Sequence, residues 1–146
     1  MTVQENEALA RAEVDKYNAH DLDGLGALFS SDAEILNVPT GVSGRGAKTA
    51  RDSAQTLLTA FPDGKFEIIS VVAGERGAAI EYWGRGTHTG NLVARAGALQ
   101  PTGRKLEVRI CDVMDIQGGK ITSVRSYWDL YGVLSQLGLT PEPAHP

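Results

Sequence analysis

Apolar and polar positions alternate near the end of the chain and predict a β-strand over residues 105–116, KLEVRICDVMDI. Asp112 lies in the middle of the apolar face of this strand. A carboxylate loses its hydration when such a face is buried, so its presence there needs a chemical or structural explanation. With a period of two residues, the other side chains on that face are Leu106, Val108, Ile110, Met114 and Ile116.

The first half of the chain has a helical period instead. Apolar side chains that recur every three or four residues predict helices over 4–20, 22–29 and 46–61. Asp21 is expected to cap the second helix. A short strand, AEILNV, and a turn-rich loop, PTGVSGRG, lie between the second and third helices.

From residue 65 onward the pattern is one of consecutive strands: KFEIISVVA, GAAIEYWGRGTHTG, RKLEVRICDVMDIQ and KITSVRSYWD. GVLSQLG predicts a last helical turn, with Asp129 before it as a helix cap. Helices followed by strands indicate an α+β fold, in which an antiparallel sheet packs one face on the helices. We expect one domain over residues 1–140 and a flexible, proline-rich tail over 141–146.

The other face of the predicted sheet carries alternating charges and one large aromatic side chain. Glu81, Trp83 and Arg85 share this face with Glu107 and Arg109 of the next strand. Tryptophan and arginine are enriched at the centres of protein interfaces. We therefore predict a homodimer formed through the outer face of the sheet.

The register of the last hairpin decides which side chains lie beside Asp112. A two-residue turn at Gly118 and Gly119 pairs position 112 with 125 and places Arg125 on the apolar face. A three-residue loop at 117–119 pairs position 112 with 124 and places Thr122, Val124, Ser126 and Trp128 there instead. We favour the second register, because Val124 and Trp128 suit an apolar wall better than Arg125 does.

A long loop joins the preceding strand, GAAIEYWGRGTHTG, to the strand that carries Asp112, so the register between these two strands is only loosely determined. Closure near residues 90 and 104 places Tyr82 opposite Asp112. His88 then lies about six residues away along the strand, roughly 20 Å at ~3.3 Å per residue. We expect no hydrogen-bonded pair between His88 and Asp112.

Composition narrows the possible functions. The 146-residue chain has a net charge of −4 and no cluster of lysine and arginine, which argues against a nucleic-acid or polybasic membrane contact. There is no signal sequence and no apolar run long enough for a membrane helix, so a cytoplasmic protein is expected. Cys111 is the one cysteine, and no His/Asp cluster has ligand spacing, so we predict no metal. Ala47 interrupts the spacing that a phosphate-binding loop needs.

Four segments, taken in order, resemble the SnoaL-like polyketide cyclases: YNAHDLDGLGALFSSDAEI, RGTHTG, PTGRKLEVRICDV and GGKITSVRSYWDLYGVLSQLG. The resemblance spans roughly residues 15–138. It implies a cone-shaped α+β barrel like that of nuclear transport factor two, in which a curved antiparallel sheet wraps a deep apolar pocket closed by the N-terminal helices. It also implies oligomers formed through the outer sheet face, and an intramolecular aldol ring closure that uses a pocket carboxylate and no metal or cofactor.

The chain departs from the cyclase pattern at two positions. In that pattern a histidine matches Asp112, and the acid/base aspartate matches Ser126. In this chain the carboxylate is on the facing strand, at Asp112, and the hydroxyl of Ser126 occupies the position of the acid/base aspartate. The resemblance therefore implies the pocket but not the position of its carboxylate.

Asp112 is the candidate catalytic residue, as a general acid or base in an apolar pocket. The alternative is a structural carboxylate, either hydrogen-bonded or paired with Arg125. His88 is either a substrate contact at the rim or a structural histidine, and the second is favoured. The other candidate substrate-binding residues, each of which could equally be core, are Tyr17, Asn37, Tyr82, Ser126 and Trp128.

The leading hypothesis is a cofactor-independent enzyme that acts on a flat, apolar, polyketide-like molecule. A hydroxylase or hydrolase of a similar ligand is the rival within enzymes. A non-catalytic small-molecule-binding protein and a dimerisation module are the alternatives from other classes. An ion pair between Asp112 and Arg125 would favour binding or structure, and an unpaired carboxylate facing a cavity would favour catalysis.

Overall fold

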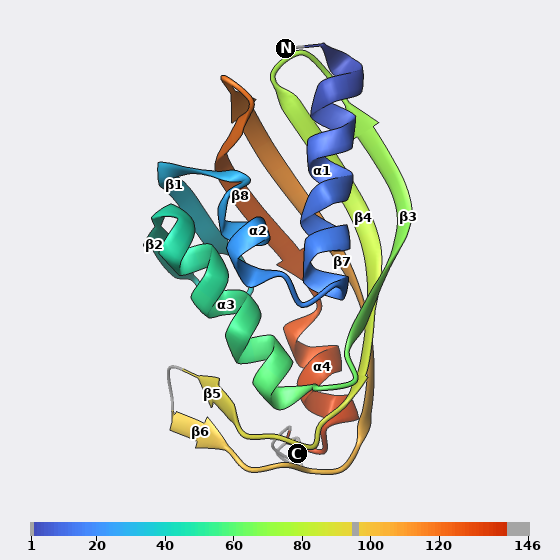
Figure 1. The fold of residues 1–146 in the computed structure, drawn as a ribbon. Helices are drawn as coiled ribbons and strands as arrows, with labels where there is room; N and C mark the ends of the chain where they lie inside the picture. The colour runs from blue at the N-terminus through green and yellow to red at the C-terminus, as the bar shows by residue number, and fades with distance from the viewer. Residues whose placement is uncertain (1, 95–96, 140–146) are drawn as a thin grey trace, which may run out of the picture.

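The computed structural model describes residues 2–94 and 97–139 (Figure 1). The predicted tail at 141–146 lies outside these residues. The helices are α1 (Val3–Asn18), α2 (Leu22–Gly26), α3 (Gly46–Ala60) and α4 (Leu130–Gln136). The strands are β1 (Phe29–Asn37), β2 (Val42–Arg45), β3 (Lys65–Ala73), β4 (Gly77–Thr87), β5 (Leu92–Ala94), β6 (Gly97–Leu99), β7 (Lys105–Gln117) and β8 (Lys120–Trp128).

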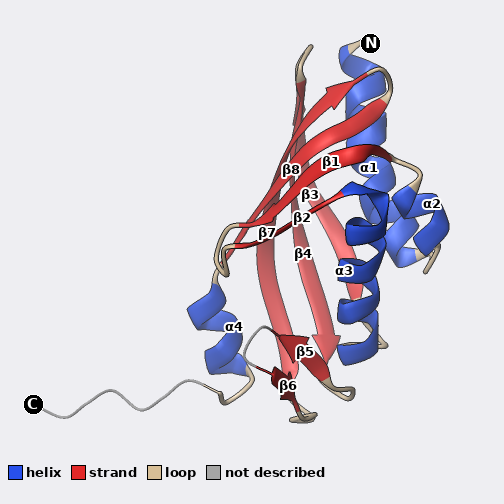
Figure 2. Ribbon diagram, turned by 90° about the vertical axis from the view of Figure 1, so that its left-hand side faces the viewer, coloured by secondary structure: helices blue, strands red, loops and turns tan. Residues whose placement is uncertain are grey.

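Within the described residues, six strands form one curved sheet in the order β2-β1-β8-β7-β4-β3. The pairs are antiparallel except for β1 and β8, which run parallel. Helices α1, α2 and α3 all lie on one side of this sheet (Figure 2). The predicted α+β architecture, with a curved and mostly antiparallel sheet covered by the N-terminal helices, is confirmed.

The face of the sheet under the helices, here called the inner face, carries the core. Ile80, Met114 and Ile121 contribute fully buried side chains from three strands. Helix α1 packs Ala10, Val14 and Tyr17 against them. The apolar stripe of α1 therefore faces the apolar stripes of the strands, as the two periods in the sequence require.

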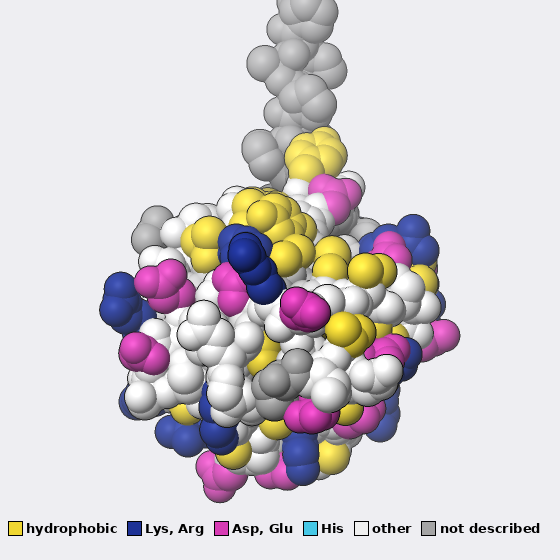
Figure 3. All heavy atoms as spheres, turned by 90° about the horizontal axis from the view of Figure 1, so that it is seen from above, with side chains coloured by type: hydrophobic (Ala, Val, Ile, Leu, Met, Phe, Trp, Pro, Cys, Tyr) yellow, Lys and Arg dark blue, Asp and Glu magenta, His cyan; other side chains and the backbone are white. Residues whose placement is uncertain are grey.

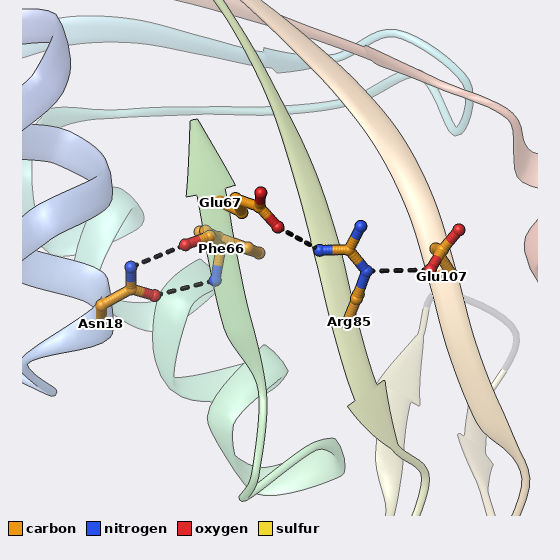
Figure 4. A network of polar contacts seen from close by, with 5 residues as sticks. All are labelled: Asn18, Phe66, Glu67, Arg85 and Glu107. Atoms are coloured by element: carbon orange, nitrogen blue, oxygen red, sulfur yellow. Dashed lines mark hydrogen bonds and ion pairs between the residues drawn. The ribbon is translucent and has the colours of Figure 1, made fainter. Parts of the chain in front are cut away.

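Two side-chain amides fasten α1 to the sheet. Near its beginning, Asn6 donates to the carbonyl oxygens of Gly74 and Glu75 in the β3–β4 turn, at 2.8 and 3.3 Å. At its end, Asn18 donates to the carbonyl of Phe66 and accepts from the Phe66 N–H, both at 2.8 Å (Figure 4). Asn18 thus satisfies the backbone of β3 as a further strand would, and α1 is fixed at both ends.

The lower end of the molecule in Figure 1 is closed by α4 and the β5–β6 hairpin. Asp129 caps α4 by accepting from the Gly132 N–H, as predicted. Gln136 of α4 bonds both the N–H and the carbonyl of Glu107, at 2.8 and 2.9 Å. Here a second apolar cluster forms around Ala60, Phe61, Val133 and Leu137.

The β7–β8 hairpin differs from both registers expected from the sequence. Its turn is the two-residue Gly118–Gly119, both with positive φ, but a bulge then shifts the pairing between Ile116↔Ile121 and Asp115↔Ser123. Asp112 therefore pairs with residue 126, and neither with 124 nor with 125. Because the shift restores even parity, Ser126 lies beside Asp112 on the inner face, as the favoured register required.

Three further details differ from the expectation. The first strand begins at Phe29, four residues before the predicted start at 33. Residues 42–45, predicted as loop, form β2 because they pair with β1 along 34–37. In β4 the register is offset by two residues, so Tyr82 lies opposite Ile110 and Ile80 lies opposite Asp112.

The outer face of the sheet carries a charged network around one tryptophan. Arg85 pairs with Glu67 at 2.6 Å and with Glu107 at 2.8 Å (Figure 4). The guanidinium groups of Arg85 and Arg109 lie 5.3 and 4.8 Å from the centre of the Trp83 ring. Acidic and basic side chains are also interspersed at the end seen from above (Figure 3), where no large area of one sign forms.

Candidate functional site

Asp112 lies at the centre of β7, between Ile80 of β4 and Ser126 of β8. Its side chain is 1% exposed. The Tyr82 hydroxyl donates to Oδ2 at 2.8 Å, and the Ser126 hydroxyl donates to Oδ1 at 2.5 Å. Each carboxylate oxygen therefore has a hydroxyl donor, and both donors come from neighbouring strands of the inner face.

A second carboxyl group, that of Glu13 on α1, lies within hydrogen-bonding reach of Asp112. Its Oε2 atom is excluded from solvent and has no donor among the described residues. Glu13 was not among the residues predicted from the sequence. The signal was present, because Glu13 lies three residues after Ala10 and four before Tyr17, on the apolar face of its helix.

Burial dominates the electrostatics of this carboxyl pair. Loss of hydration raises the pKa of Asp112, although the hydrogen bonds from Glu13, Ser126 and Tyr82 oppose the shift. Burial, and then the charge of Asp112, raise the pKa of Glu13 well above its ordinary value. Burial also raises the pKa of the Tyr82 hydroxyl, which therefore stays protonated and able to donate at neutral pH.

Arg125 does not pair with Asp112. It lies opposite Val113, and its guanidinium contacts Asp115 at 3.6 Å and the Ser123 hydroxyl at 3.3 Å. The ion pair that would have favoured a purely structural role is therefore absent from the described contacts of Asp112.

Aromatic rings cover one side of the carboxyl pair. Tyr17 stacks on Phe66 with ring centres 4.1 Å apart, and Phe66 contacts Tyr82 at 4.8 Å. Burial raises the pKa of Tyr17 to about 12. Both predicted tyrosines thus belong to one aromatic stack, and Tyr82 is the one whose hydroxyl bonds Asp112.

The other side of the pair is less enclosed. Asn37 lies next to Ser126 through the β1–β8 pairing, and its Oδ1 accepts from the Trp128 indole N–H at 3.1 Å. Asn37, Ser126 and Trp128 are half-buried, in contrast to Asp112 and Tyr82. These three side chains therefore form the more accessible side of the Asp112 group.

His88 lies apart from this group, just beyond the end of β4. Its fully buried ring contacts Phe61 at 5.4 Å between ring centres, and its Nδ1 accepts from the Thr102 N–H at 3.3 Å. The proton of a neutral ring must then be on Nε2, which has no partner among the described residues. His88 forms no pair with Asp112 and faces the lower end of the molecule.

Two surface hollows, of about 360 and 230 Å³, lie away from Asp112. Their walls consist largely of side chains from the outer face of β4 and β7 and from α4, and neither hollow includes Asp112. Among residues 2–94 and 97–139, no three His, Cys, Asp or Glu side chains are grouped as a metal site. None of the helices in that part of the chain has the length and apolar character needed to cross a bilayer.

A sequence model of the SnoaL-like polyketide cyclases matches residues 7–137. No curated protein matched the chain. The proposed hydroxylase AclR from Streptomyces galilaeus is 24% identical, with 97% of this chain and 89% of that chain covered and a TM-score of 0.80. The proposed polyketide cyclase IdmH from Streptomyces antibioticus is also 24% identical, with 90% of this chain and 96% of that chain covered and a TM-score of 0.73. An LEH-like epoxide hydrolase from M. tuberculosis is 18% identical, with 92% of this chain and 90% of that chain covered and a TM-score of 0.68.

Proposed function

Because the chain belongs to the SnoaL-like polyketide cyclase family, we propose that it is a cofactor-independent acid/base enzyme acting on a flat, apolar, polyketide-like small molecule. The reaction is an aldol-type cyclisation, with Asp112 as the base. One observation carries the proposal: a solvent-excluded carboxylate on the inner face, held by two hydroxyl donors and by no described cation. Such a carboxylate can exchange a proton with a carbon acid without competition from water.

The proposed steps conserve charge and protons. Asp112 takes a proton from the carbon next to a substrate carbonyl, and the electron pair of the C–H bond forms an enolate. As Asp112 becomes neutral, the hydroxyls of Tyr82 and Ser126 turn their protons to the enolate oxygen. The enolate carbon then bonds to a second carbonyl carbon of the same molecule, and Asp112 returns its proton to the resulting alkoxide.

The half-buried side of the site would hold the substrate. The indole of Trp128 offers a flat apolar surface to a ring, and its hydrogen bond to Asn37 fixes its plane. Ser126 lies between this surface and Asp112. Tyr17 bounds the site through Phe66. His88, whose fully buried ring lies apart from Asp112, is not included in this substrate site.

Hydrogen–deuterium exchange tests the base directly. Flat polyketide-like ketones are incubated with the protein in D2O, and deuterium at the carbon next to the carbonyl is followed by mass spectrometry. We expect the wild-type protein to accelerate this exchange and Asp112→Asn to lose ~10²–10⁴-fold of the acceleration.

Asp115→Asn is the matched control, because Asp115 lies three residues away on the same strand but is exposed on the outer face. It should retain the wild-type rate. Exchange that survives Asp112→Asn would reject Asp112 as the base. Ligand binding without any exchange would instead indicate a binding protein.

A further inference from the structure

Glu13 and Asp112 form a pair of neighbouring carboxyl groups between α1 and the sheet. We propose that the pair holds a single shared proton at neutral pH, carried by Glu13, so that Asp112 is the charged member and Glu13 donates a hydrogen bond to it. Glu13 is then a positioning residue that acts through Asp112. This inference rests on the proposed function for its chemical consequence, but its test does not.

Two charged carboxylates cannot share this site. Asp112 is 1% exposed, and Oε2 of Glu13 is excluded from solvent. None of the ion pairs between described residues includes either group. Glu13 as a whole is half-buried, but Asp112 and one oxygen of Glu13 are shielded from water, and no described cation pairs with either group. Under these conditions one of two adjacent carboxyl groups retains its proton.

The surrounding donors decide which group is charged. Asp112 receives one hydroxyl proton on each oxygen, from Tyr82 and Ser126. One oxygen of Glu13 has no donor within the described part of the chain. The described titratable groups that face Glu13 are Asp112 of β7 and Tyr82 of β4, and neither of them is a cation. A negative charge is therefore better stabilised on Asp112, and the proton belongs on Glu13.

The position of Glu13 is set by the framework of the fold. Asn6 and Asn18 fasten the two ends of α1 to the β3–β4 turn and to the edge of β3. Between these attachments the helix buries Ala10, Val14 and Tyr17 against the sheet. A glutamate between Ala10 and Tyr17 on that face has to point at the inner face, where Asp112 lies.

The pair has two consequences for the chemistry. The hydrogen bond from Glu13 helps Asp112 to stay ionised in an apolar enclosure, which a base requires before the substrate arrives. The site also carries one net negative charge without a described cation nearby, so it disfavours a carboxylate at the reacting end of a substrate. We infer that the substrate reacts through an uncharged ketone or ester.

A carboxyl-carbon NMR titration tests the shared proton without a substrate. The protein is labelled with ¹³C at the side-chain carboxyl groups of Asp and Glu, and the shifts are followed with pH. In the wild-type protein we expect Glu13 to titrate well above the ordinary value of ~4.3. In Asp112→Asn the Glu13 step should move down by about one pH unit or more, a tenfold change in proton affinity.

Variants at position 13 test the donor role while leaving Asp112 in place. Glu13→Gln keeps an N–H donor, so the Asp112 titration should stay near the lower step of the wild-type pair. Glu13→Met keeps the length but removes the donor, so the Asp112 step should move to higher pH. Infrared difference spectra at pH 7 should show a protonated carboxylic acid in the wild-type protein that Glu13→Gln lacks. Asp15→Asn, at an exposed position of the same helix, should keep it.

Two results would overturn the inference: a Glu13 that titrates at its ordinary value, or a Glu13 step that does not move in Asp112→Asn. Because the titration needs no substrate, it is independent of the exchange assay. A shared proton without exchange would reject the proposed function alone, and exchange without a shared proton would reject this inference alone.

Discussion

Each oxygen of Asp112 accepts a hydroxyl proton, from Tyr82 on one strand and from Ser126 on another. These bonds stabilise the charged form, yet burial outweighs them, and the pKa of Asp112 is raised. Burying this carboxylate costs free energy, and the fold itself does not require a carboxylate at this position. Active sites commonly show this conflict, because a group arranged for reactivity is seldom the one that stabilises the fold most.

The stability of Asp112→Asn therefore separates a working carboxylate from a structural one. Asparagine keeps the shape of the side chain and one acceptor oxygen, but removes the buried charge. We expect a free energy of unfolding at pH 7 equal to or above the wild-type value, measured by denaturant titration. Asp115→Asn on the outer face should change it by less than ~0.5 kcal/mol. A loss above ~2 kcal/mol in Asp112→Asn would mean that the carboxylate holds the fold together.

At the scale of the elements, α1 brings Glu13 and Tyr17 of the candidate site to the sheet. Its two amide attachments use side chains where another strand or turn would use backbone. Asn18 at the edge of β3 and Gln136 beside Glu107 of β7 do this in the same way, each with one donated and one accepted bond. Asn18 thus covers part of the edge strand β3, and Gln136 covers the part of β7 that extends beyond its pairing with β8.

Asn18→Ala tests the attachment of α1. The substitution leaves the N–H and the carbonyl of Phe66 without their partner, so we expect a loss of about 1–3 kcal/mol in the free energy of unfolding. Asn18→Asp keeps the acceptor and loses the donor, so its free energy of unfolding should lie between those of the wild-type protein and Asn18→Ala. Gln4→Ala, at an exposed position of the same helix, serves as the control and should stay within ~0.5 kcal/mol. An unchanged Asn18→Ala would show that packing alone holds the helix.

The elements and their faces were predictable where the information is local. The period of two places Val124 and Trp128 on one face of their own strand, and the structure has that face on the same side of the sheet as Asp112. The pairing itself was not predictable, because the bulge at Thr122 and the two-residue offset of β4 depend on how the whole sheet curves. Glu13 was missed for a related reason: a single charge in a helix is ordinary until the opposing strand is known to present another.

For the whole molecule, the buried pair makes the free energy of unfolding depend on pH. The raised pKa values of Glu13 and Asp112 mean that the folded state binds more protons than the unfolded state above pH ~4, where free carboxyl groups ionise. The free energy of unfolding must then decrease as the pH rises through this window, by up to ~1.4 kcal/mol per pH unit for each retained proton.

Denaturant titrations between pH 4.5 and 8 should show this decrease in the wild-type protein. Glu13→Gln should remove its upper part, because glutamine has no proton to lose, and should be more stable than the wild-type protein at pH 8. The lowered pKa values of Asp21 and Asp63 act below this range and in the opposite sense. A stability that rises with pH from 4.5 to 8 would contradict the buried pair.

The outer face of the sheet remains the predicted dimer interface. It presents Trp83 between Arg85 and Arg109 on a surface that α1, α2 and α3 leave uncovered (Figure 2). We expect sedimentation to show a dimer at micromolar concentration and Trp83→Ala to shift it toward monomer. Tyr131→Ala, which removes an aromatic side chain 67% exposed on α4, is the control. A wild-type monomer under these conditions would reject the interface.

The parallel pairing of β1 with β8 joins the first strand of the chain to the last. Asn37 and Trp128 are 91 residues apart in sequence, and Ala27 and Lys120 are 93 apart, yet each pair is hydrogen-bonded. Contacts of such long range form late and slow the folding reaction. As the chain emerges from the ribosome, β1 and β7 therefore wait as open edges until β8 inserts between them. A nascent chain arrested before residue 120 lacks Ser126 and Trp128 of the candidate site, and we expect it to aggregate through these open edges.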